Sequence, residues 1–153
     1  MVRTAGDIVS EYALTSCIRC GKCDKVCPSA RNGGLHPDSV IYGMVDAEPS
    51  SDMSGIHSEV WKCLMCHRCS MNCPKGIDVA GAMRSVRYDS ASSGGSPKRF
   101  RKASDTLVET GRAFPVNAIA DQKRAELGLP PIHDDGSAEE LKIIMSRTGF
   151  RRE

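Results

Sequence analysis

The sequence predicts a mainly α-helical fold in two parts, and three observations support this prediction. The 35 residues between two cysteine-rich segments repeat their apolar side chains at helical spacing. Helical patterns also lie before the first segment and after the second. Beyond a run of small residues, further helical patterns follow, and each ends at a glycine. We therefore expect a helical domain over residues 1–90, a flexible link over 91–97 and a helical tail over 98–153.

The first expected helix lies before the first cysteine. Thr4 and Asp7 are three residues apart and fit a capping pair at a helix N-terminus. Ile8 and Tyr12, together with Val9, then supply the apolar side chains of this helix. The pattern predicts a capped helix that leads into the first cysteine-rich segment.

Two further helices are expected around the second segment. His36-Pro37-Asp38 is a suitable helix start, because proline is favoured at the first helical position. The apolar residues that follow are Val40, Ile41, Met44 and Val45. Their spacing indicates a helix rather than a pair of strands. After the second segment, Val79, Met83 and Val86 share one side of a helix expected over 77–87.

Eight cysteines fall in two copies of the pattern C-x2-C-x2-C-x3-C-P, with none left over. The first copy is Cys17, Cys20, Cys23 and Cys27, and the second is Cys63, Cys66, Cys69 and Cys73. Such spacing lets three thiolates of a tight loop reach three corners of one [4Fe–4S] cube, while the fourth reaches the other cluster. The pattern therefore predicts an electron carrier with two [4Fe–4S] clusters.

Two other uses of eight cysteines fit the pattern less well. A disulfide framework gives no reason for two identical spacings. Zinc can be held by two C-x2-C pairs, but these pairs are well separated in a zinc ribbon. Here a third cysteine follows each pair at the same interval. A zinc-bound interaction module without redox function remains the alternative.

Composition limits the core and the partners. Only 5% of the 153 residues are aromatic, so we expect a thin core that bound clusters reinforce. The formal net charge of +2 is too small to suggest nucleic acid binding. No apolar stretch approaches the roughly 18 residues of a membrane helix, and the first residues show no secretion signal. We expect a cytoplasmic protein that binds neither nucleic acid nor membrane.

The tail is expected to form three helices. The first begins with the basic run Lys98–Lys102 and ends at Gly111. Its apolar stripe consists of Phe100, Ala103, Ser104, Leu107 and Val108. The basic run is either a solvated face or a docking surface for an acidic partner.

The other two tail helices are shorter. One opens at Asn117 and stops at the breaker Gly128–Pro131, and the last has a capping box of Ser137 and Glu140 and ends at Gly149. Such a tail cannot bury much apolar surface by itself, so we expect it to dock on another subunit.

Helices around two cluster loops resemble the all-helical ferredoxin fold of succinate dehydrogenase and fumarate reductase iron–sulfur subunits. The resemblance implies that the fourth cysteine of each segment is exchanged. One cluster would then be held by Cys17, Cys20, Cys23 and Cys73, and the other by Cys27, Cys63, Cys66 and Cys69.

Further motifs are similar to those of the C subunit of heterodisulfide reductase. They include Cys-x-Arg-Cys-Gly-Lys-Cys in the first segment and Trp61-Lys62-Cys63 and Cys73-Pro74-Lys75-Gly76-Ile77 in the second. In the tail, residues 111–117, 126–131 and 148–150 carry the likeness, which extends from about Ile8 to Phe150.

This resemblance implies an electron-transfer subunit of a methanogenic heterodisulfide reductase. In that family an A subunit with flavin and iron–sulfur clusters supplies electrons. A B subunit with noncubane clusters reduces the disulfide of coenzyme M and coenzyme B. We expect no catalytic residue here, since the Cys-Cys-Gly motifs of the B subunit are absent. The complex is expected to be a larger, dimeric assembly of different subunits. The alternative is an equivalent relay in a related complex of bacterial sulfur metabolism or in another multi-subunit oxidoreductase.

Three residues near the cysteines have expected roles beside the ligands. Gly21 either permits close approach of the backbone to the first cluster or simply forms a turn. His67 is expected to be a loop side chain, because four thiolates complete each cube, with a tuning role as the alternative. Trp61 is expected to cover the second loop as an apolar side chain.

Overall fold

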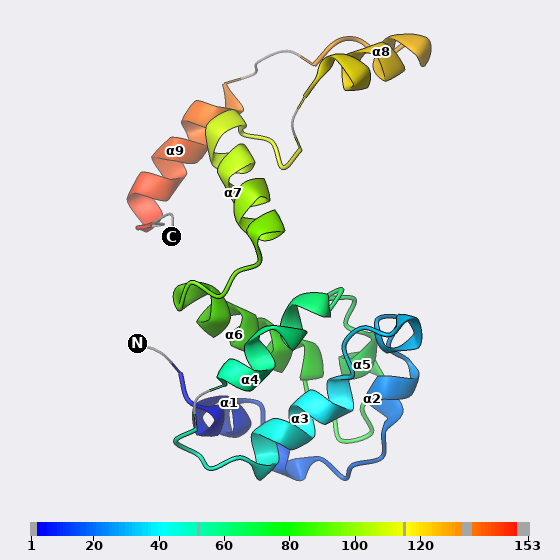
Figure 1. Ribbon diagram of the computed structural model, residues 1–153, viewed down its shortest axis with the longest axis vertical. Coiled ribbons are helices and arrows are strands. Elements are labelled where there is room, and N and C mark those ends of the chain that lie inside the picture. The colour runs from blue at the N-terminus through cyan, green and yellow to red at the C-terminus, as the bar shows by residue number, and fades with distance from the viewer. Residues whose placement is uncertain (1–2, 52, 115, 133–135, 150–153) are drawn as a thin grey trace. The chain divides into compact units, whose positions relative to one another are not determined.

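Helices and turns make up the described part of the chain, which contains no strand. The structure is a computed structural model, and it describes residues 3–51, 53–114, 116–132 and 136–149 (Figure 1). The chain divides into two units, Met1–Ser96 and Pro97–Glu153. The predicted mainly α-helical fold is confirmed.

Helix α1 (Ala5–Glu11) begins at the predicted capping pair. The hydroxyl of Thr4 accepts a hydrogen bond from the Asp7 N–H at 3.3 Å, and the Asp7 carboxylate accepts one from the Thr4 N–H at 2.7 Å. Ile8 is fully buried and Tyr12, at the C-cap, is partly buried. The reciprocal hydrogen bonds satisfy two backbone donors that the helix leaves without partners.

Helix α3 (Pro37–Asp46) occupies the spacer between the cysteine segments. It starts with Pro37 directly after His36, as the sequence predicts. Its apolar side chains enter the core, where Ile41 and Met44 are almost fully buried. The periodicity of the spacer therefore predicted the buried face of this helix correctly.

Helix α6 (Val79–Ser92) is the longest helix of the first unit. The carboxylate of Asp78 caps it by accepting a hydrogen bond from the Gly81 N–H at 2.9 Å. Ala91 and Ser92, which we expected in a link, belong to this helix. The chain turns only afterwards, where Gly95 N–H donates to the carbonyl of Ser90 at 2.7 Å. Local hydrogen bonding thus extends the helix beyond the last apolar repeat.

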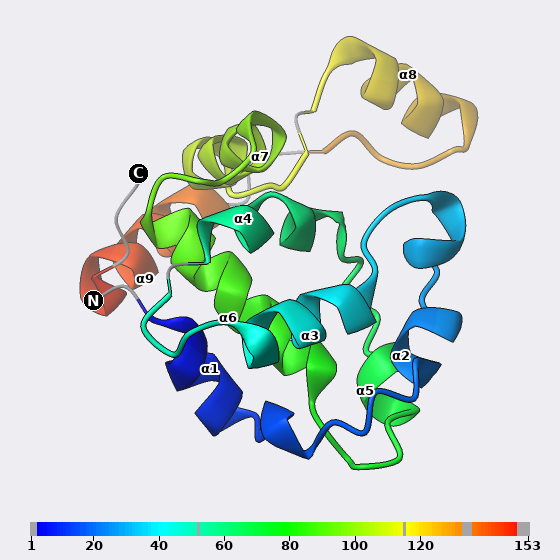
Figure 2. The same ribbon diagram turned by 60° about the horizontal axis from the view of Figure 1, so that its bottom comes forward.

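The core of the first unit lies between α1, α3 and α6. Helix α1 contacts α3 and α6, and α6 also contacts α4 (Ser54–His57), as Figure 2 shows. The largest fully buried apolar side chains are Ile8, Leu14, Leu35, Ile41, Met44, Val60, Met83 and Val86. These side chains are aliphatic or are methionines, as expected for a sequence with few aromatic residues.

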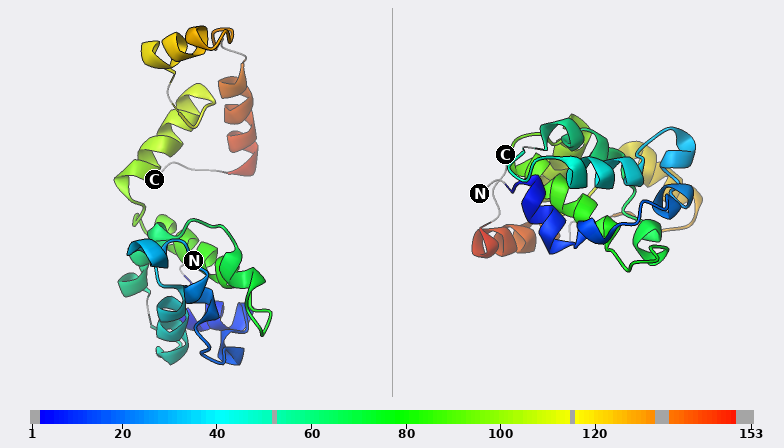
Figure 3. Two further views of the ribbon diagram at one scale, coloured as in Figure 1. Left: turned by 90° about the vertical axis from the view of Figure 1, so that its right-hand side faces the viewer. Right: turned by 90° about the horizontal axis from the view of Figure 1, so that it is seen from below.

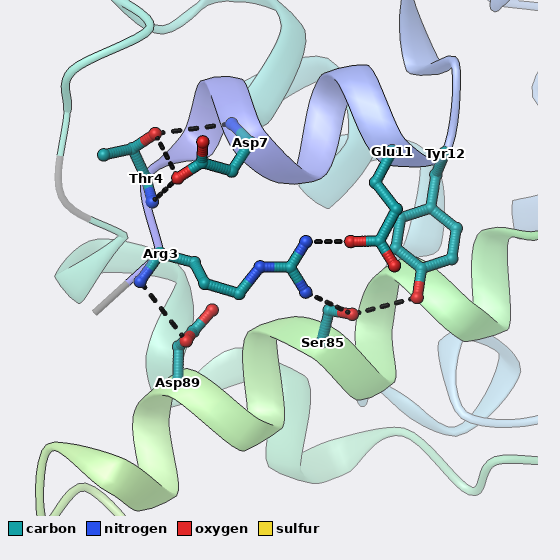
Figure 4. Close-up of polar contacts among 7 residues, drawn as sticks. All are labelled: Arg3, Thr4, Asp7, Glu11, Tyr12, Ser85 and Asp89. Atoms are coloured by element: carbon teal, nitrogen blue, oxygen red, sulfur yellow. Dashed lines mark hydrogen bonds and ion pairs between the residues drawn. The ribbon is translucent and has the colours of Figure 1, made fainter. Parts of the chain in front are cut away.

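A polar network holds the segment before α1 against α6 (Figure 4). Arg3 forms an ion pair with Glu11, and its guanidinium donates to the hydroxyl of Ser85 at 3.2 Å. The hydroxyl of Tyr12 lies 2.9 Å from the same Ser85 oxygen. The Arg3 N–H donates to the buried carboxylate of Asp89 at 3.4 Å. The N-terminal segment is thereby fixed to the helix that supports the cysteine loops.

The second unit contains α7 (Lys98–Thr110), α8 (Ala118–Glu126) and α9 (Ser137–Thr148). Helices α7 and α9 contact each other (Figure 3), and each ends at a glycine with left-handed backbone, Gly111 and Gly149. Helix α8 starts directly after Asn117, close to the expected opening, and Asn117 caps it by accepting from the Ala120 N–H at 2.9 Å.

The predicted capping box of α9 is wrong. Gly136 is the N-cap residue and Ser137 is already the first helical residue. Two residues of the tail segments that carry the family resemblance, Pro115 and Phe150, lie outside the described residues.

No helix in the described ranges is both long enough and apolar enough to cross a membrane.

Candidate iron–sulfur centres

The two cysteine segments fold as structural copies of each other. Each begins directly after a 3-10 helix, η1 (Leu14–Ser16) in the first copy and η3 (Glu59–Lys62) in the second. Cys17 and Cys63, which follow these helices, have nearly the same extended backbone, with φ of −66° and −69°. The repeated sequence pattern is therefore also a repeated backbone conformation.

Positive φ angles recur at matching positions between the cysteines. Arg19 and Met65 both have φ of 51°, while Gly21 has 65° and His67 has 60°. Left-handed backbone is unfavourable for residues with a Cβ atom. Arg19, Met65 and His67 therefore adopt this turn at a conformational cost. The same left-handed turns shape both cysteine loops.

A short helix follows each of these turns and carries the third cysteine. The helices are α2 (Lys22–Lys25), with Cys23, and α5 (Arg68–Met71), with Cys69. They contact each other. The fourth cysteine follows each helix, Cys27 after α2 and Cys73 after α5.

Each of two cavities is lined by four cysteines. The first cavity is lined by Cys17, Cys20, Cys23 and Cys73. The second is lined by Cys27, Cys63, Cys66 and Cys69. The fourth cysteine of each segment thus lies at the cavity formed by the other segment. The eight expected ligands are brought together in two groups of four.

Apolar side chains form much of the remaining wall of each cavity. Ile18, Ile41, Tyr42, Ile77 and Val79 line the first cavity. Pro37, Leu64, Ala80 and Met83 line the second. An apolar wall lowers the local dielectric constant, and this is one of the factors that set the reduction potential of a bound cluster.

The sulfur atoms lie farther apart than ligands of a single zinc ion. Zinc–sulfur bonds of about 2.3 Å in a tetrahedral site place the sulfurs about 3.8 Å from one another. All eight cysteines lie in the described residues and are free thiols, and no three of their sulfurs lie within 4.8 Å of one another. Four thiols around a wider cavity fit a cluster of several iron atoms.

Burial disfavours the thiolate form of three cysteines. It raises the pKa of Cys23 to about 12, with a further contribution from the negative charge of Asp38. Burial also raises the pKa of Cys63 and of Cys69. A raised pKa makes a thiol a poor free nucleophile, whereas a coordinating metal deprotonates it. Without a metal, these three thiols are therefore protonated at neutral pH.

Backbone and side-chain hydrogen bonds stabilise the second loop. The Met65 N–H points at the Cys63 sulfur at 3.4 Å. Ser29 donates from its hydroxyl to the Lys62 carbonyl at 2.8 Å and accepts from the Leu35 N–H at 2.9 Å. The chain after the first cysteine segment is thus tied to the chain before the second.

The three accessory residues lie where the sequence suggested. Gly21 lines the first cavity, and a Cβ atom there would meet only the Asp38 carboxylate, at 3.9 Å. His67 is an exposed residue at the second cavity. Trp61 is partly buried against the core, and its indole N–H donates to the Ser90 hydroxyl at 3.0 Å. Its expected role as a cover of the second loop stays a prediction.

Sequence reasoning missed two residues at the second loop. Ser29 and Arg87 both bind backbone carbonyls just before or at the first cysteine of that loop. The available signal was slight: Ser29 follows a Cys-Pro pair, and Arg87 stands one residue after an apolar position of its helix. Neither signal identifies a carbonyl partner more than 20 residues away in the chain.

Fold and cysteine pattern together define a class of protein. The profile of the 4Fe-4S dicluster domain matches residues 13–77, which include all eight cysteines. The chain is thus an iron–sulfur protein with a helical cluster domain.

Full-length comparisons identify the family. The chain is 31% identical over 142 residues to the C subunit of ferredoxin:CoB-CoM heterodisulfide reductase of Methanosarcina mazei, covering 90% of this chain and 86% of the relative. It is 32% identical, with the same coverage, to the C subunit of ferredoxin/F(420)H(2)-dependent CoB-CoM heterodisulfide reductase of Methanosarcina acetivorans. The C subunit of H(2):CoB-CoM heterodisulfide,ferredoxin reductase of Methanothermobacter thermautotrophicus is 27% identical, over 97% of this chain and 80% of its own length. The chain belongs to the family of heterodisulfide reductase C subunits, which confirms the resemblance found in its motifs.

Proposed function

We propose that this chain is the electron-transfer subunit of a heterodisulfide reductase complex. It carries electrons through two [4Fe–4S] clusters, from a flavin-containing A-type subunit to a B-type subunit that reduces the coenzyme M–coenzyme B disulfide. The observation that carries this proposal is the grouping of the eight cysteines around two cavities, four at each.

The ligands of the two clusters follow from this grouping. Cys17, Cys20, Cys23 and Cys73 hold the first cluster, and Cys27, Cys63, Cys66 and Cys69 hold the second. A [4Fe–4S] cluster supplies reversible one-electron chemistry within a wide range of potentials. The protein's own contribution is to fix the thiolates, to aim backbone N–H groups at sulfur and to exclude water with apolar walls.

The surface of the first unit supports a relay with two ends. Ile18 lies at the first cavity and is 59% exposed, while Leu64 occupies the matching position at the second and is 65% exposed. Each cavity therefore has an apolar side chain that reaches the surface. Electrons can be exchanged with one partner at the first cavity and with another at the second.

Reduction of the disulfide takes place on another chain. All eight cysteines are used as ligands, and no two are adjacent in the sequence, as they are in the catalytic motifs of a B-type subunit. This chain therefore supplies no catalytic residue to that reaction.

The second unit docks on the partner subunits. Its exposed large apolar residues include Phe114, Ile119, Leu127, Ile143 and Ile144, of which Phe114 is 82% exposed. A small unit that leaves so much apolar surface uncovered is suited to burial in an interface. In this arrangement, the cluster domain continues to the end of α6 at Ser92, residues 93–97 form the link and residues 98–153 form the docking tail. The complex is a cytoplasmic, larger dimeric assembly.

Purification of the tagged chain from its own cells without oxygen tests this proposal. We expect a flavoprotein and a subunit with Cys-Cys-Gly repeats to co-purify, and we expect the assembly to reduce the coenzyme M–coenzyme B disulfide. The isolated chain should be reduced and reoxidised but should not act on the disulfide. Disulfide reduction by the isolated chain, or a complex with neither subunit, would contradict the proposal. Partners that act on a different sulfur compound would favour the alternative relay.

A further inference from the structure

Arg87 on α6 binds the chain segment that leads into the second cavity. Its Nε donates to the carbonyl oxygen of Val60 at 2.9 Å, and its Nη2 donates to that of Trp61 at 3.2 Å. Nη2 also donates to the carbonyl oxygen of Cys63. One guanidinium thus contacts three carbonyls over four consecutive residues.

These carbonyls lie at the end of the 3-10 helix η3. The Val60 carbonyl also accepts from the Cys63 N–H at 3.1 Å, whereas the last carbonyls of a helix lack helical donors and can be satisfied by a basic side chain. The planar, forked donors of arginine can reach several carbonyls at once, whereas the ammonium of lysine acts as a point charge. Arg87 therefore fixes the peptide group of Cys63 in a way that few other side chains could.

The guanidinium is itself held in place by Trp61. Its Cζ lies 5.2 Å from the centroid of the Trp61 ring, a distance at which the cation is attracted by the ring face. The indole N–H donates in turn to Ser90, which lies one turn further along the same helix. Arg87, Trp61 and Ser90 thus form a connected support between α6 and η3.

The charge of Arg87 is also part of the electrostatic environment of Cys63. The guanidinium donates to the Cys63 carbonyl, so its charge lies beside the first cysteine of the second cavity. One electron added at this cavity adds one negative charge, and a half-buried cation beside it stabilises that charge. His67 also lines the second cavity, but it is exposed.

We propose that Arg87 is a positioning residue for the second cluster, which fixes the backbone of Cys63 and raises the reduction potential of that cluster alone. This inference rests on the proposed ligation of the second cluster by Cys27, Cys63, Cys66 and Cys69. It adds a residue that sets the relative potentials of the two ends of the relay.

Three variants of the full chain test the inference. Arg87→Gln removes the charge, and Arg87→Lys keeps the charge but loses the forked hydrogen-bond donors of the guanidinium. The control, Arg84→Gln, removes a charge from an exposed position of the same helix. Redox titration followed by electron paramagnetic resonance measures both potentials, with signals assigned through Cys20→Ser and Cys66→Ser. We expect a lower potential of the second cluster in Arg87→Gln, a smaller shift in Arg87→Lys and no change in Arg84→Gln. The first cluster should keep its potential in all three.

Iron content supplies the second measurement. Selective loss of iron from the second site in Arg87→Gln, with retention in Arg87→Lys, would also support the inference. Potentials equal to those of Arg84→Gln, equal shifts of both clusters, or loss of iron from both sites in both Arg87 variants would overturn it. A wild-type chain without iron at the second site would instead refute the proposed function.

Discussion

The guanidinium of Arg87 donates a hydrogen bond to the carbonyl oxygen of Cys63, although 24 positions separate the two residues. This contact joins the longest helix of the first unit to the first cysteine of the second loop. The cysteine loops are thus parts of the helical core and not appendages to it. Changes in the core should therefore affect the clusters, and changes in ligation should follow the spatial grouping of the cysteines.

Replacement of Cys73 by serine should damage the same cluster as replacement of Cys17. The reason is that Cys73 lines the first cavity, although it belongs to the second cysteine segment. Electron paramagnetic resonance of the two variants should show the same signal lost or altered. Cys27→Ser is the matched control and should affect the other signal, because Cys27 lines the second cavity. A Cys73 variant that disturbs the cluster of Cys63, Cys66 and Cys69 would refute the crossed ligation.

His67→Gly should stabilise the protein. His67 has φ of 60°, and left-handed backbone costs a residue with a Cβ atom about 1–2 kcal/mol. Glycine avoids this cost but loses about 0.5–1 kcal/mol of backbone entropy on folding. The net gain should be about 0.5–1 kcal/mol, seen as a higher midpoint of thermal unfolding of the cluster-loaded protein.

Gly21→Ala is the counterpart of that change at the first loop. Gly21 has φ of 65°, and its Cβ would meet no atom closer than 3.9 Å. The expected destabilisation of about 1 kcal/mol is therefore conformational rather than steric. An unchanged midpoint in both variants would show that the left-handed turns do not contribute to stability as described.

Gly81→Ala should destabilise the first unit by about 1–3 kcal/mol, since it overpacks a filled site. A Cβ at Gly81 would lie 2.6 Å from the ring of Tyr12 and 2.3 Å from the carboxylate of Asp78, which caps α6. Circular dichroism at 222 nm during heating measures the change.

Gly43→Ala is the control, because it makes the same change in α3 where no atom lies within 4 Å of the new Cβ. It should stabilise the protein by about 0.5–1 kcal/mol. Equal effects of the two substitutions would contradict the described packing of α1 on α6.

Removal of residues 98–153 should leave both clusters intact but weaken assembly with partner subunits. The eight cysteines all lie in the first unit, and the second unit exposes large apolar side chains. Iron content and pull-down of partner subunits measure the two effects separately. Unchanged co-purification would count against the docking role of the tail, and loss of iron would show that the second unit is needed for cluster binding.

The features predicted from the sequence are those that local patterns determine. The capping pair of Thr4 and Asp7 and the buried face of α3 depend on residues close together in the chain, and both were predicted correctly. The capping box of Ser137 failed because Gly136 adopts left-handed backbone, with φ of 77°, and takes the N-cap position itself. A glycine before a favourable capping residue can thus shift the helix start by one position.

For the candidate site too, features set by local spacing were predicted and long-range contacts were not. Repeated spacing alone predicted the two cysteine loops, and it agrees with the dicluster domain match over residues 13–77. The spacing rule indicated that the fourth cysteine of each segment reaches the other cluster, and the resemblance to a known fold implied the two ligand sets that contain Cys27 and Cys73. The contacts of Ser29 and Arg87 were not predictable from the sequence. Each side chain binds a backbone carbonyl that is far away in the chain, and the two come close only because α6 and the chain between the cysteine segments pack against the second loop.

The central claim is that four thiols at each of two cavities hold a [4Fe–4S] cluster. Its most direct test is the content of iron, acid-labile sulfide and zinc in the chain purified without oxygen. We predict about eight iron and eight sulfide per chain, as two such clusters require, and no zinc. A colourless protein with zinc and no iron would contradict it.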